Sequence, residues 1–399
     1  MKKEWENKVL SEICTFSSYR TEVKKLNKTN YVSTENLLPN KSGKTDASAI
    51  PTKGQVIEIR PNMTLISNIR PYFKKIYFSE SYGGCSNDVL AFVPKDNISA
   101  KWLYYLLSND SFFDYVMSGT KGTKMPRGDK SQIMNYPICL PKKEDQIKMV
   151  RVLDSLENKI RYNTLINQNL EAQAQAIFKS WFVDFEPFGG KMPAGWGQGC
   201  LSDVLSVIES GSRPKGGSES SGVPSIGAEN IDGIGHYDYS KEKYINRDFF
   251  QNLRHGKVNS GDILLYKDGA YVGKVSMALN GFPHEICAVN EHVFILRTNE
   301  RLPSQSYLYL FLAQHSIRNK IATLGSAKAA QPGVNQSDIK GIALTIPNKR
   351  TIQAFENIAS SLFSKIVQNS IQSRRLSQLR DTLLPKLMSG EIDVSDVAV

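Results

Sequence analysis

The residues with catalytic potential in this sequence do not combine into a recognisable reactive site. All five histidines lie in the second half of the chain, and their spacing fits no metal-ligand pattern. Residues 269–274 are one residue short of a phosphate-binding loop, and Val275 stands where Ser or Thr should ligate magnesium. Asp262 and Asp338 match a nuclease carboxylate cluster only loosely. The sequence therefore argues against an ATPase, a metal enzyme and a nuclease.

Methyl transfer to a DNA base has no obvious site either. Amino-group methyltransferases hold the flipped base with an Asn/Asp-Pro-Pro-aromatic tetrapeptide, and this chain contains no Pro-Pro pair. Two Gly-x-Gly sequences, at 195–197 and 233–235, do not follow a hydrophobic strand, as a nucleotide-binding fingerprint requires. We therefore predict no catalytic, cofactor-binding or metal-binding residue in this chain.

Side chains suited to DNA contact are instead concentrated in two long polar loops. Arg and Lys suit guanine, Asn and Gln suit adenine, and Lys, Arg, Ser and Thr suit phosphates. Loops 119–130 and 325–336 share one frame but differ in side chains, as two domains reading different sequences would need. A solvated polar loop is the alternative. The candidates are Lys121, Lys124, Arg127, Lys130, Lys328, Gln331, Asn335 and Gln336.

A second group of polar and aromatic residues directly follows predicted strands. Strand-end loops are well placed to enter a DNA groove, although such loops are also kept polar for solubility. Tyr72 lies within the first of these segments. The candidates are Asn68, Arg70, Lys74 and Lys75 in the first half and Lys267, Tyr271 and Lys274 in the second. Arg213 and Lys215 lie in a separate Ser/Gly-rich turn and are candidates for additional phosphate contacts.

The composition is that of a large basic protein from a reducing compartment. The chain has 399 residues, which favours two or more domains, and its formal net charge of +11 favours a polyanionic partner. Five scattered cysteines without a C-x-x-C pair argue against a disulfide framework and a zinc knuckle. The N-terminus leads into no apolar signal segment, and no stretch is long and apolar enough for a membrane span. We expect a cytoplasmic protein without a membrane association.

An internal repeat covers nearly the whole sequence. Trp5 returns as Trp196, and the segment 31–37 returns as 225–231, 194 residues later. Beyond Pro141 and its counterpart Pro347 the offset stays at 206. Insertions have therefore accumulated in the loops of two related domains but not in the segment that follows each domain.

The segment after each domain is predicted to be one long helix. Residues 144–184 contain no Pro or Gly, and apolar residues such as Met149, Leu156 and Leu170 recur on a seven-residue grid. The second copy repeats this grid. A helix of this length would span roughly 60 Å, which is too long for one side of a small domain. Two antiparallel helices forming a coiled-coil spacer are therefore expected.

A polar residue interrupts each helical grid near its middle, Asn163 in the first copy and Asn369 in the second. A buried Asn can fix the register of a coiled coil at some cost in stability. If the helices pack antiparallel, the two residues would lie near the crossing and could pair. Solvation of both, at a place where the seam opens, is the alternative.

Each repeated half is predicted to be a mixed α/β domain. Strands are expected at 65–69, 75–78 and 88–93, and in the second half at 262–266 and 292–296. One helix is expected from a cap at Ser99 to before Gly119, with its aromatic stripe in the core. We predict a first domain at 1–143, a spacer helix at 144–185, a linker and second domain at 186–349, and a second spacer helix with tail at 350–399.

The complete pattern resembles the specificity subunit of type I restriction-modification enzymes. The resemblance covers essentially the full chain. It rests on the internal repeat and on four shorter segments, which are 325–347, Gly261-Asp262-Ile263-Leu264, and the helix ends 181–188 and 383–392. It implies two target recognition domains that each read half of an asymmetric, interrupted DNA site, with the helices setting the gap. The first domain departs from the pattern, because Asn62-Met63-Thr64-Leu65 replaces Gly-Asp-Ile-Leu.

The resemblance also implies partners that carry the chemistry. Two methyltransferase subunits would dock on this chain, restriction subunits would join them, and these partners would use S-adenosylmethionine, ATP and Mg²⁺. Aromatic residues on the remaining surface of the first helix would either bind these subunits or pack against the domains. These residues are Phe178, Trp181, Phe182 and Phe185.

Three other functions are also compatible with the sequence. The chain could be a stand-alone DNA methyltransferase or nuclease with a cryptic site, which S-adenosylmethionine binding by the isolated chain would support. It could be a structural coiled-coil adaptor, which would show no DNA sequence preference. It could also serve a methylation-only or phage-exclusion complex.

Overall fold

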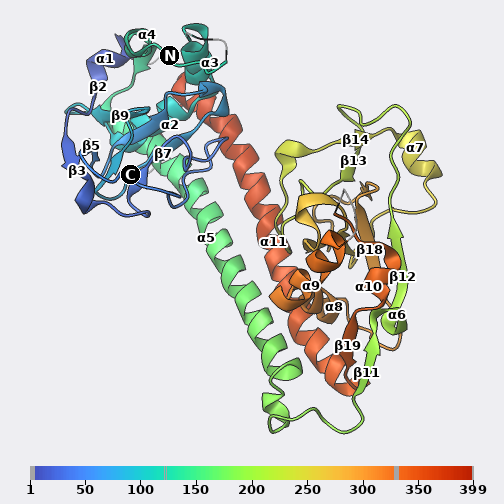
Figure 1. Cartoon of the computed structure of the whole chain (residues 1–399). Coiled ribbons are helices and arrows are strands. Elements are labelled where there is room, and N and C mark those ends of the chain that lie inside the picture. The colour runs from blue at the N-terminus through green and yellow to red at the C-terminus, as the bar shows by residue number, and fades with distance from the viewer. Residues whose placement is uncertain (1–4, 121, 123, 328–331, 398–399) are drawn as a thin grey trace. The chain divides into compact units, whose positions relative to one another are not determined.

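The computed structural model of the chain describes residues 5–120, 122, 124–327 and 332–397 (Figure 1). The chain forms two compact units, and each is described by itself. Unit 1 contains residues 1–158 and 376–399, and unit 2 contains residues 159–375. Unit 1 thus takes residues from both ends of the sequence, so the duplicated frame does not fold as two consecutive domains.

Unit 1 is built on two four-stranded sheets and a short strand pair. The first sheet has the order β2-β9-β6-β7 and the second the order β3-β5-β8-β4, while β1 pairs with β10. Alternating apolar residues of β6 and β9 enter two hydrophobic clusters, one on each side of the first sheet. The strands are β1 Glu6–Val9, β2 Cys14–Phe16, β3 Arg20–Glu22, β4 Tyr31–Val32, β5 Gln55–Ile59, β6 Thr64–Ser67, β7 Ile76–Phe78, β8 Gly83–Cys85, β9 Val89–Pro94 and β10 Pro137–Leu140.

The segment predicted as one helix from Ser99 to before Gly119 is two helices. α2 spans Ala100–Ser108 and α3 spans Asp110–Ser118. Asn109 separates them because its backbone is extended and its side chain accepts a hydrogen bond from the Ser111 amide, which caps α3. Ser99 does cap the first helix, and the aromatic stripe is buried as expected. The remaining short helices are α1 Leu10–Ile13 and α4 Lys130–Met134.

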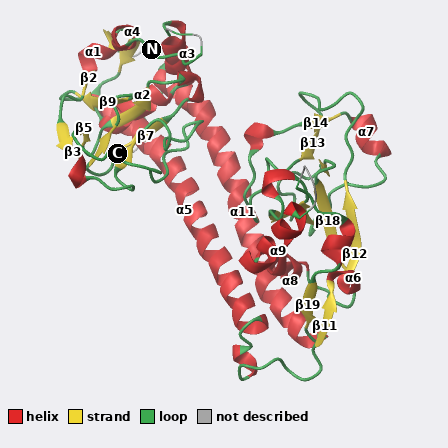
Figure 2. Ribbon diagram, viewed as in Figure 1, coloured by secondary structure: helices red, strands yellow, loops and turns green. Residues whose placement is uncertain are grey.

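Unit 2 repeats this arrangement with longer loops (Figure 2). Its main sheet has the order β12-β18-β15-β16, a second sheet has the order β14-β13-β17, and β11 pairs with β19. Its strands are β11 Gly197–Cys200, β12 Leu205–Ser210, β13 Val223–Ile226, β14 Tyr244–Ile245, β15 Ile263–Tyr266, β16 Val275–Met277, β17 Ala288–Val289, β18 Val293–Thr298 and β19 Ala343–Ile346. Its short helices are α6 Leu201–Val204, α7 Arg247–Asn252, α8 Gln305–Ala313, α9 His315–Ser326 and α10 Gln336–Lys340.

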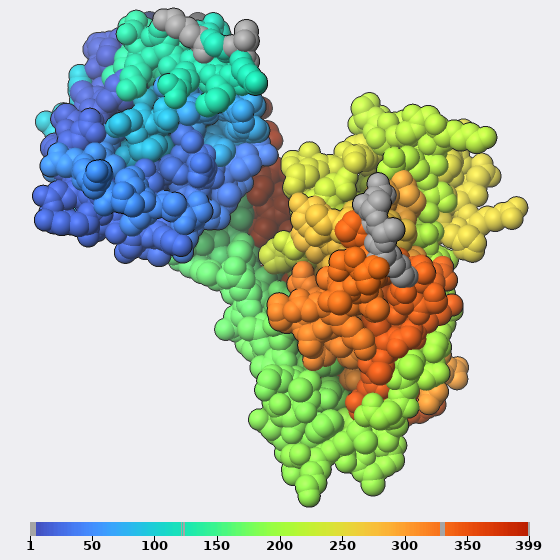
Figure 3. All heavy atoms as spheres, in the orientation of Figure 1, coloured from blue at the N-terminus to red at the C-terminus, as the bar shows by residue number. Residues whose placement is uncertain are grey.

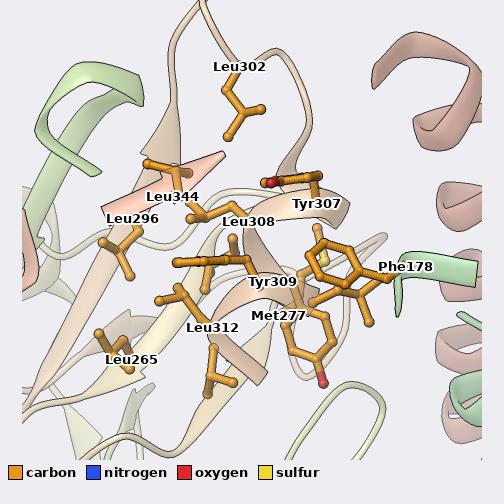
Figure 4. Packing of buried hydrophobic residues seen from close by; sticks show 14 of the residues in the cluster. Phe178, Leu265, Met277, Leu296, Leu302, Tyr307, Leu308, Tyr309, Leu312 and Leu344 are labelled. Carbon is orange, nitrogen blue, oxygen red and sulfur yellow. The ribbon is translucent and has the colours of Figure 1, made fainter. Parts of the chain in front are cut away.

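The core of unit 2 lies between the main sheet, α8 and the long helices. Leu265 and Leu296 of the sheet face Leu308 and Leu312 of α8, and Phe178 approaches Tyr307 from the neighbouring long helix (Figure 4). The aromatic residues of α8 are therefore core residues.

Two helices of 40 residues each link the sheets, α5 at Lys143–Phe182 and α11 at Lys349–Met388. They run antiparallel in both units, because Asn163 contacts Gln372 while Asn167 contacts Ser370 in unit 2, and Glu157 faces Arg380 in unit 1. The predicted class, a mixed α/β fold with two related domains and two long packed antiparallel helices, is confirmed.

Candidate nucleic-acid interface

In unit 1 the two groups of predicted DNA-contacting residues lie side by side. The strand β6 continues into Asn68, Ile69 and Arg70, and the loop that follows α3 returns to pair with them. The Arg70 amide donates to the Pro126 carbonyl at 2.8 Å, and the Gly128 amide donates to the Asn68 carbonyl at 3.2 Å. We call this pair of backbone hydrogen bonds the loop clamp.

Unit 2 contains the same clamp at the corresponding positions. The Gly269 amide donates to the Pro332 carbonyl at 2.7 Å, and the Val334 amide donates to the Lys267 carbonyl at 2.9 Å. The strand-side residues are offset by 199 from those of unit 1, and the loop-side residues are offset by 206. Because both bonds use only backbone atoms, the clamp persists while the side chains on it differ.

Around the clamp of unit 1, four predicted cations lie at the surface. Arg70, Lys124, Arg127 and Lys130 are exposed. Arg70 has left-handed backbone geometry with φ of 50°, and its guanidinium has no ion-pair partner among the described residues. Arg127 lies 3.2 Å from Asp88. These residues give unit 1 a basic surface suited to phosphate or guanine contact.

Three predicted DNA-contacting residues of unit 1 are instead buried or bound to other groups of the unit. Asn68 is buried beneath the loop, so its side chain does not reach the surface. The Lys75 ammonium donates to the Thr34 carbonyl at 2.6 Å, and burial lowers its pKa. Lys74 lies 3.0 Å from Asp110. The sequence showed their charge and polarity but not these tertiary contacts.

Around the clamp of unit 2, three of the predicted cations are held by carboxylates. Arg213 lies 2.7 Å from Glu291, Lys267 lies 2.6 Å from Asp268, and Lys274 lies 3.3 Å from Asp232. Lys215 and Tyr271 are exposed. This surface is therefore a network of mixed charge, unlike the surface of unit 1.

The acidic residues of this network are not among the residues predicted from the sequence. His292 lies 2.9 Å from Asp268 and 3.3 Å from Glu291, so one imidazole bridges two carboxylates. Asp268 directly follows the predicted strand and the predicted contact Lys267, and this position was the available signal. Carboxylates can accept a hydrogen bond from the amino group of cytosine, which gives unit 2 acceptors as well as donors.

The remaining loop candidates have different outcomes. Asn335 caps α10, since its side chain accepts the Asp338 amide at 3.0 Å, and it is exposed. Gln336 is also exposed. Lys121, Lys328 and Gln331 lie outside the described residues.

Asp262, considered above for nuclease chemistry, belongs to a buried ion pair. Its two carboxylate oxygens accept hydrogen bonds from Nε and an Nη atom of Arg297 at 2.6 and 2.7 Å. One of them also accepts the Asn259 amide at 2.7 Å. The Gly-Asp-Ile-Leu sequence is thus a structural element of β15 and its preceding turn.

Buried amides lie where α5 crosses α11 in unit 2. Nδ2 of Asn163 donates to Oε1 of Gln372 at 2.9 Å and contacts the Asn369 carbonyl at 3.3 Å. The Asn369 side chain donates to Oδ1 of Asn167 at 2.9 Å. Both predicted residues are therefore close together, with Asn167 as the side-chain partner of Asn369. Their role in fixing register remains a prediction.

The four aromatic residues predicted to bind partner subunits are mostly covered. Phe178 and Phe182 are buried in the unit 2 core against Tyr307 and Phe355. Trp181 and Phe185 are partly buried against the same core. The structure thus favours the alternative interpretation, packing against the domain, for Phe178 and Phe182.

Nucleophilic and metal-binding groups are poorly placed for catalysis. Burial raises the pKa of Cys14, Cys85 and Cys287 to about 12, so these thiols stay protonated and unreactive. Among the described residues, no three His, Cys, Asp or Glu side chains are grouped as a metal site would require. Within the same residues, every helix is too short or too polar to cross a membrane.

The doubled clamp on two sheets joined by long helices defines a class of paired recognition domains, and comparisons identify the family. The family model of the type I restriction modification DNA specificity domain matches residues 2–172 and 193–380. The chain therefore belongs to this family. Three of the four clamp residues differ between the two repeats, whereas Pro126 and Pro332 are the same.

Specificity subunits of type I restriction enzymes are similar to this chain over most of its length. The HindI specificity subunit of Haemophilus influenzae is 26% identical over 98% of this chain and 100% of that relative. The MjaIX specificity subunit of Methanocaldococcus jannaschii is 27% identical over 76% of this chain and 72% of that relative. The solved S subunit from M. genitalium has the same fold, with a TM-score of 0.60, 14% identity and 96% coverage of both chains.

The chain is therefore a type I restriction-modification specificity subunit, whose role is to recognise the DNA target within the complex. This subunit is not the catalytic component of such enzymes.

Proposed function

We propose that each unit of this chain reads one half of a bipartite, asymmetric DNA site through the loop on its clamp. The observation that carries the proposal is the pair of clamps, which are equivalent in backbone hydrogen bonds and different in side chains. Equivalent backbone hydrogen bonds would hold both loops in the same way, and the different side chains on the two loops would read different bases. The candidate reading surface includes Arg70 and Arg127 in unit 1 and the Asp268–His292 network in unit 2.

The two antiparallel helices would set the distance between the two recognition units, and with it the length of the DNA spacer between the two half-sites. A helix of 40 residues spans about 60 Å, and recognition elements that enter successive major grooves are about 34–36 Å apart. The buried amides at the crossing would resist sliding of one helix along the other. The domain boundaries predicted at residues 143, 185 and 349 belong to this proposal.

Two methyltransferase subunits and associated restriction subunits would assemble on this chain in the cytoplasm and supply the S-adenosylmethionine, ATP and Mg²⁺ chemistry. Tyr162, Leu165 and Ile166 support a docking surface, because they lie on one face of α5 and are 54, 50 and 42% exposed. Part of α5 is uncovered in the space-filling view (Figure 3). We propose this face of α5 as a contact for a methyltransferase subunit.

Mapping of methylated motifs in cells tests the reading function. The chain is expressed with its methyltransferase, and residues 1–143 or 190–349 are then exchanged for those of a relative. We expect a bipartite motif in which one half changes with each exchange. A continuous palindromic motif, or a motif that changes in both halves after one exchange, would refute the proposal.

Co-purification tests the docking surface separately. The substitution Leu165→Glu should weaken capture of the methyltransferase subunit while sequence-selective DNA binding by the chain is retained. Thr164→Glu, at an exposed neighbouring position of the same helix, is the matched control. Equal capture by both variants would exclude this face as the contact.

A further inference from the structure

One exposed tyrosine occupies the same position beside each loop clamp. Tyr72 is 46% exposed and Tyr271 is 53% exposed. The turns that carry them are closed alike, because the Ser67 amide donates to the Lys75 carbonyl at 3.1 Å and the Tyr266 amide donates to the Lys274 carbonyl at 2.9 Å. Both bonds have the same offset of 199, so the two tyrosines are structurally equivalent.

The other residues of this turn differ between the repeats. Arg70-Pro71-Tyr72-Phe73-Lys74 in unit 1 corresponds to Gly269-Ala270-Tyr271-Val272-Gly273 in unit 2. Only the tyrosine is retained across these five positions. A shared buried residue would be explained by packing, but packing does not explain a shared side chain that is half exposed.

In both units the ring is supported and the hydroxyl is available. The Tyr72 ring packs against Phe73 with 4.6 Å between centroids, and the Lys274 ammonium lies 4.7 Å from the centre of the Tyr271 ring. Neither tyrosine hydroxyl has a hydrogen-bond partner within the described part of the chain. Each side chain is therefore a partly fixed aromatic group with a free donor.

The position of these tyrosines indicates what the donor contacts. Tyr72 lies two residues beyond Arg70, and Tyr271 lies two residues beyond Gly269, and both of these residues form the clamp of the proposed reading loop. A tyrosine hydroxyl is a recurrent donor to DNA phosphate oxygens, a contact that is independent of base identity. A residue common to two loops that read different bases should make such a contact.

We infer that Tyr72 and Tyr271 make the same contact to the DNA phosphodiester backbone, once in each half of the site. Each is a positioning residue that holds the adjacent loop against the duplex, while the variable side chains of the loop read the bases. This inference rests on the proposed function and adds a sequence-independent anchor to it.

Phenylalanine substitutions test the anchor without disturbing the fold, because they remove only an exposed hydroxyl. The full chain carrying Tyr72→Phe, Tyr271→Phe or both is titrated with duplex DNA containing the mapped site, and with duplexes in which either half is scrambled. Tyr82→Phe is the control, since Tyr82 is 68% exposed and lies outside the clamp turn.

We expect each single variant to bind the cognate duplex roughly 3- to 10-fold more weakly, as for loss of one hydrogen bond, and the double variant to show the product of both losses. The ratio of cognate to scrambled affinity should stay unchanged, and so should the salt dependence, because no charge is removed. The control should bind like the wild type.

Two results would overturn the inference while the proposed function stands. One is tyrosine variants that bind like the wild type on a duplex that the wild type does discriminate. The other is a change in the preferred half-site, which would make the tyrosine a base-reading residue. A wild-type chain without any preference for the bipartite duplex would instead refute the proposed function itself.

Discussion

The buried ion pair of unit 2 has an apolar equivalent in unit 1, and this difference yields a quantitative prediction. Asp262 corresponds to Met63 through the offset of β6 and β15, and Arg297 corresponds to Val93 through the offset of β9 and β18. The local hydrogen bond also has its counterpart, since the Arg60 amide lies 3.3 Å from Sδ of Met63. Both charges have been replaced together, which suggests that they are stabilising only as a pair.

Single substitutions should expose the cost of an unpaired charge. Arg297→Val leaves a carboxylate whose side chain is 2% exposed, and removal of one partner of a buried pair costs about 3–5 kcal/mol. Asp262→Met leaves a guanidinium that is 26% exposed and still donates to the Lys257 carbonyl, so about 2–3 kcal/mol is expected after solvent screening. The double variant reproduces the unit 1 pair and should lie within about 1 kcal/mol of the wild type.

Chemical denaturation of the four proteins, with hydrogen exchange of β15 and β18 peptides to localise the effect, measures this cycle. The coupling energy should be at least about 3 kcal/mol. Melting temperature should fall by about 6–12 °C for a single variant that loses 3 kcal/mol. Additive losses in the double variant would refute the reasoning, because they would show that each charge has independent stabilising contacts. Exchange in β6 and β9 of unit 1 serves as the internal control.

Three further outcomes follow from the packing. Asn369→Leu should destabilise unit 2 by about 1–3 kcal/mol in chemical denaturation, because Oδ1 of buried Asn167 loses its donor. Leu387→Ala should cost about 2–5 kcal/mol and increase hydrogen exchange in β1 and β10 of unit 1, because Leu387 is buried in that core. Burial raises the pKa of Glu157, so ionisation of this carboxyl opposes folding, and the stability of the protein should fall as pH rises through the raised pKa. Glu157→Gln removes the ionisable group. This variant should therefore melt at a higher temperature than the wild type at pH 7 and lose this advantage below pH 4.

The repeat and the apolar periodicity predicted the architecture well. The five predicted strands are present as β6, β7, β9, β15 and β18, with ends within about two residues, and the long helices extend over the predicted segments. These features depend on local pattern and on chain length, which a sequence displays directly. The break at Asn109 was missed because a cap competes with an otherwise continuous apolar stripe, and its outcome depends on tertiary packing.

The candidate interface was predicted only in part, because charge in a sequence does not show its partner. In each half, two polar segments were predicted separately as DNA-contacting candidates. The fold brings them together through backbone hydrogen bonds between residues more than 50 positions apart, such as Arg70 and Pro126. Lys75 and Asn68 are residue types that commonly contact DNA. In this fold, however, the Lys75 ammonium donates to the Thr34 carbonyl and Asn68 is buried. Asp268 and His292 pair across 24 positions, and no local pattern indicates such a pair.

The interleaved course of the chain constrains how recognition can change without loss of the fold. The unit 1 core contains Leu384, Leu387 and Val394 from the C-terminal region, and the Lys148 ammonium lies against the Ser395 carbonyl. If the N-terminal part of unit 1 is replaced by another sequence, the replacement must still pack against the C-terminal part of α11 and the tail. This requirement explains why the sheets and helices that make these contacts are shared between the repeats. The clamp requires only backbone donors and acceptors, so the loop it holds is free of this constraint. Side chains on that loop can then vary without the cost that a core change would impose.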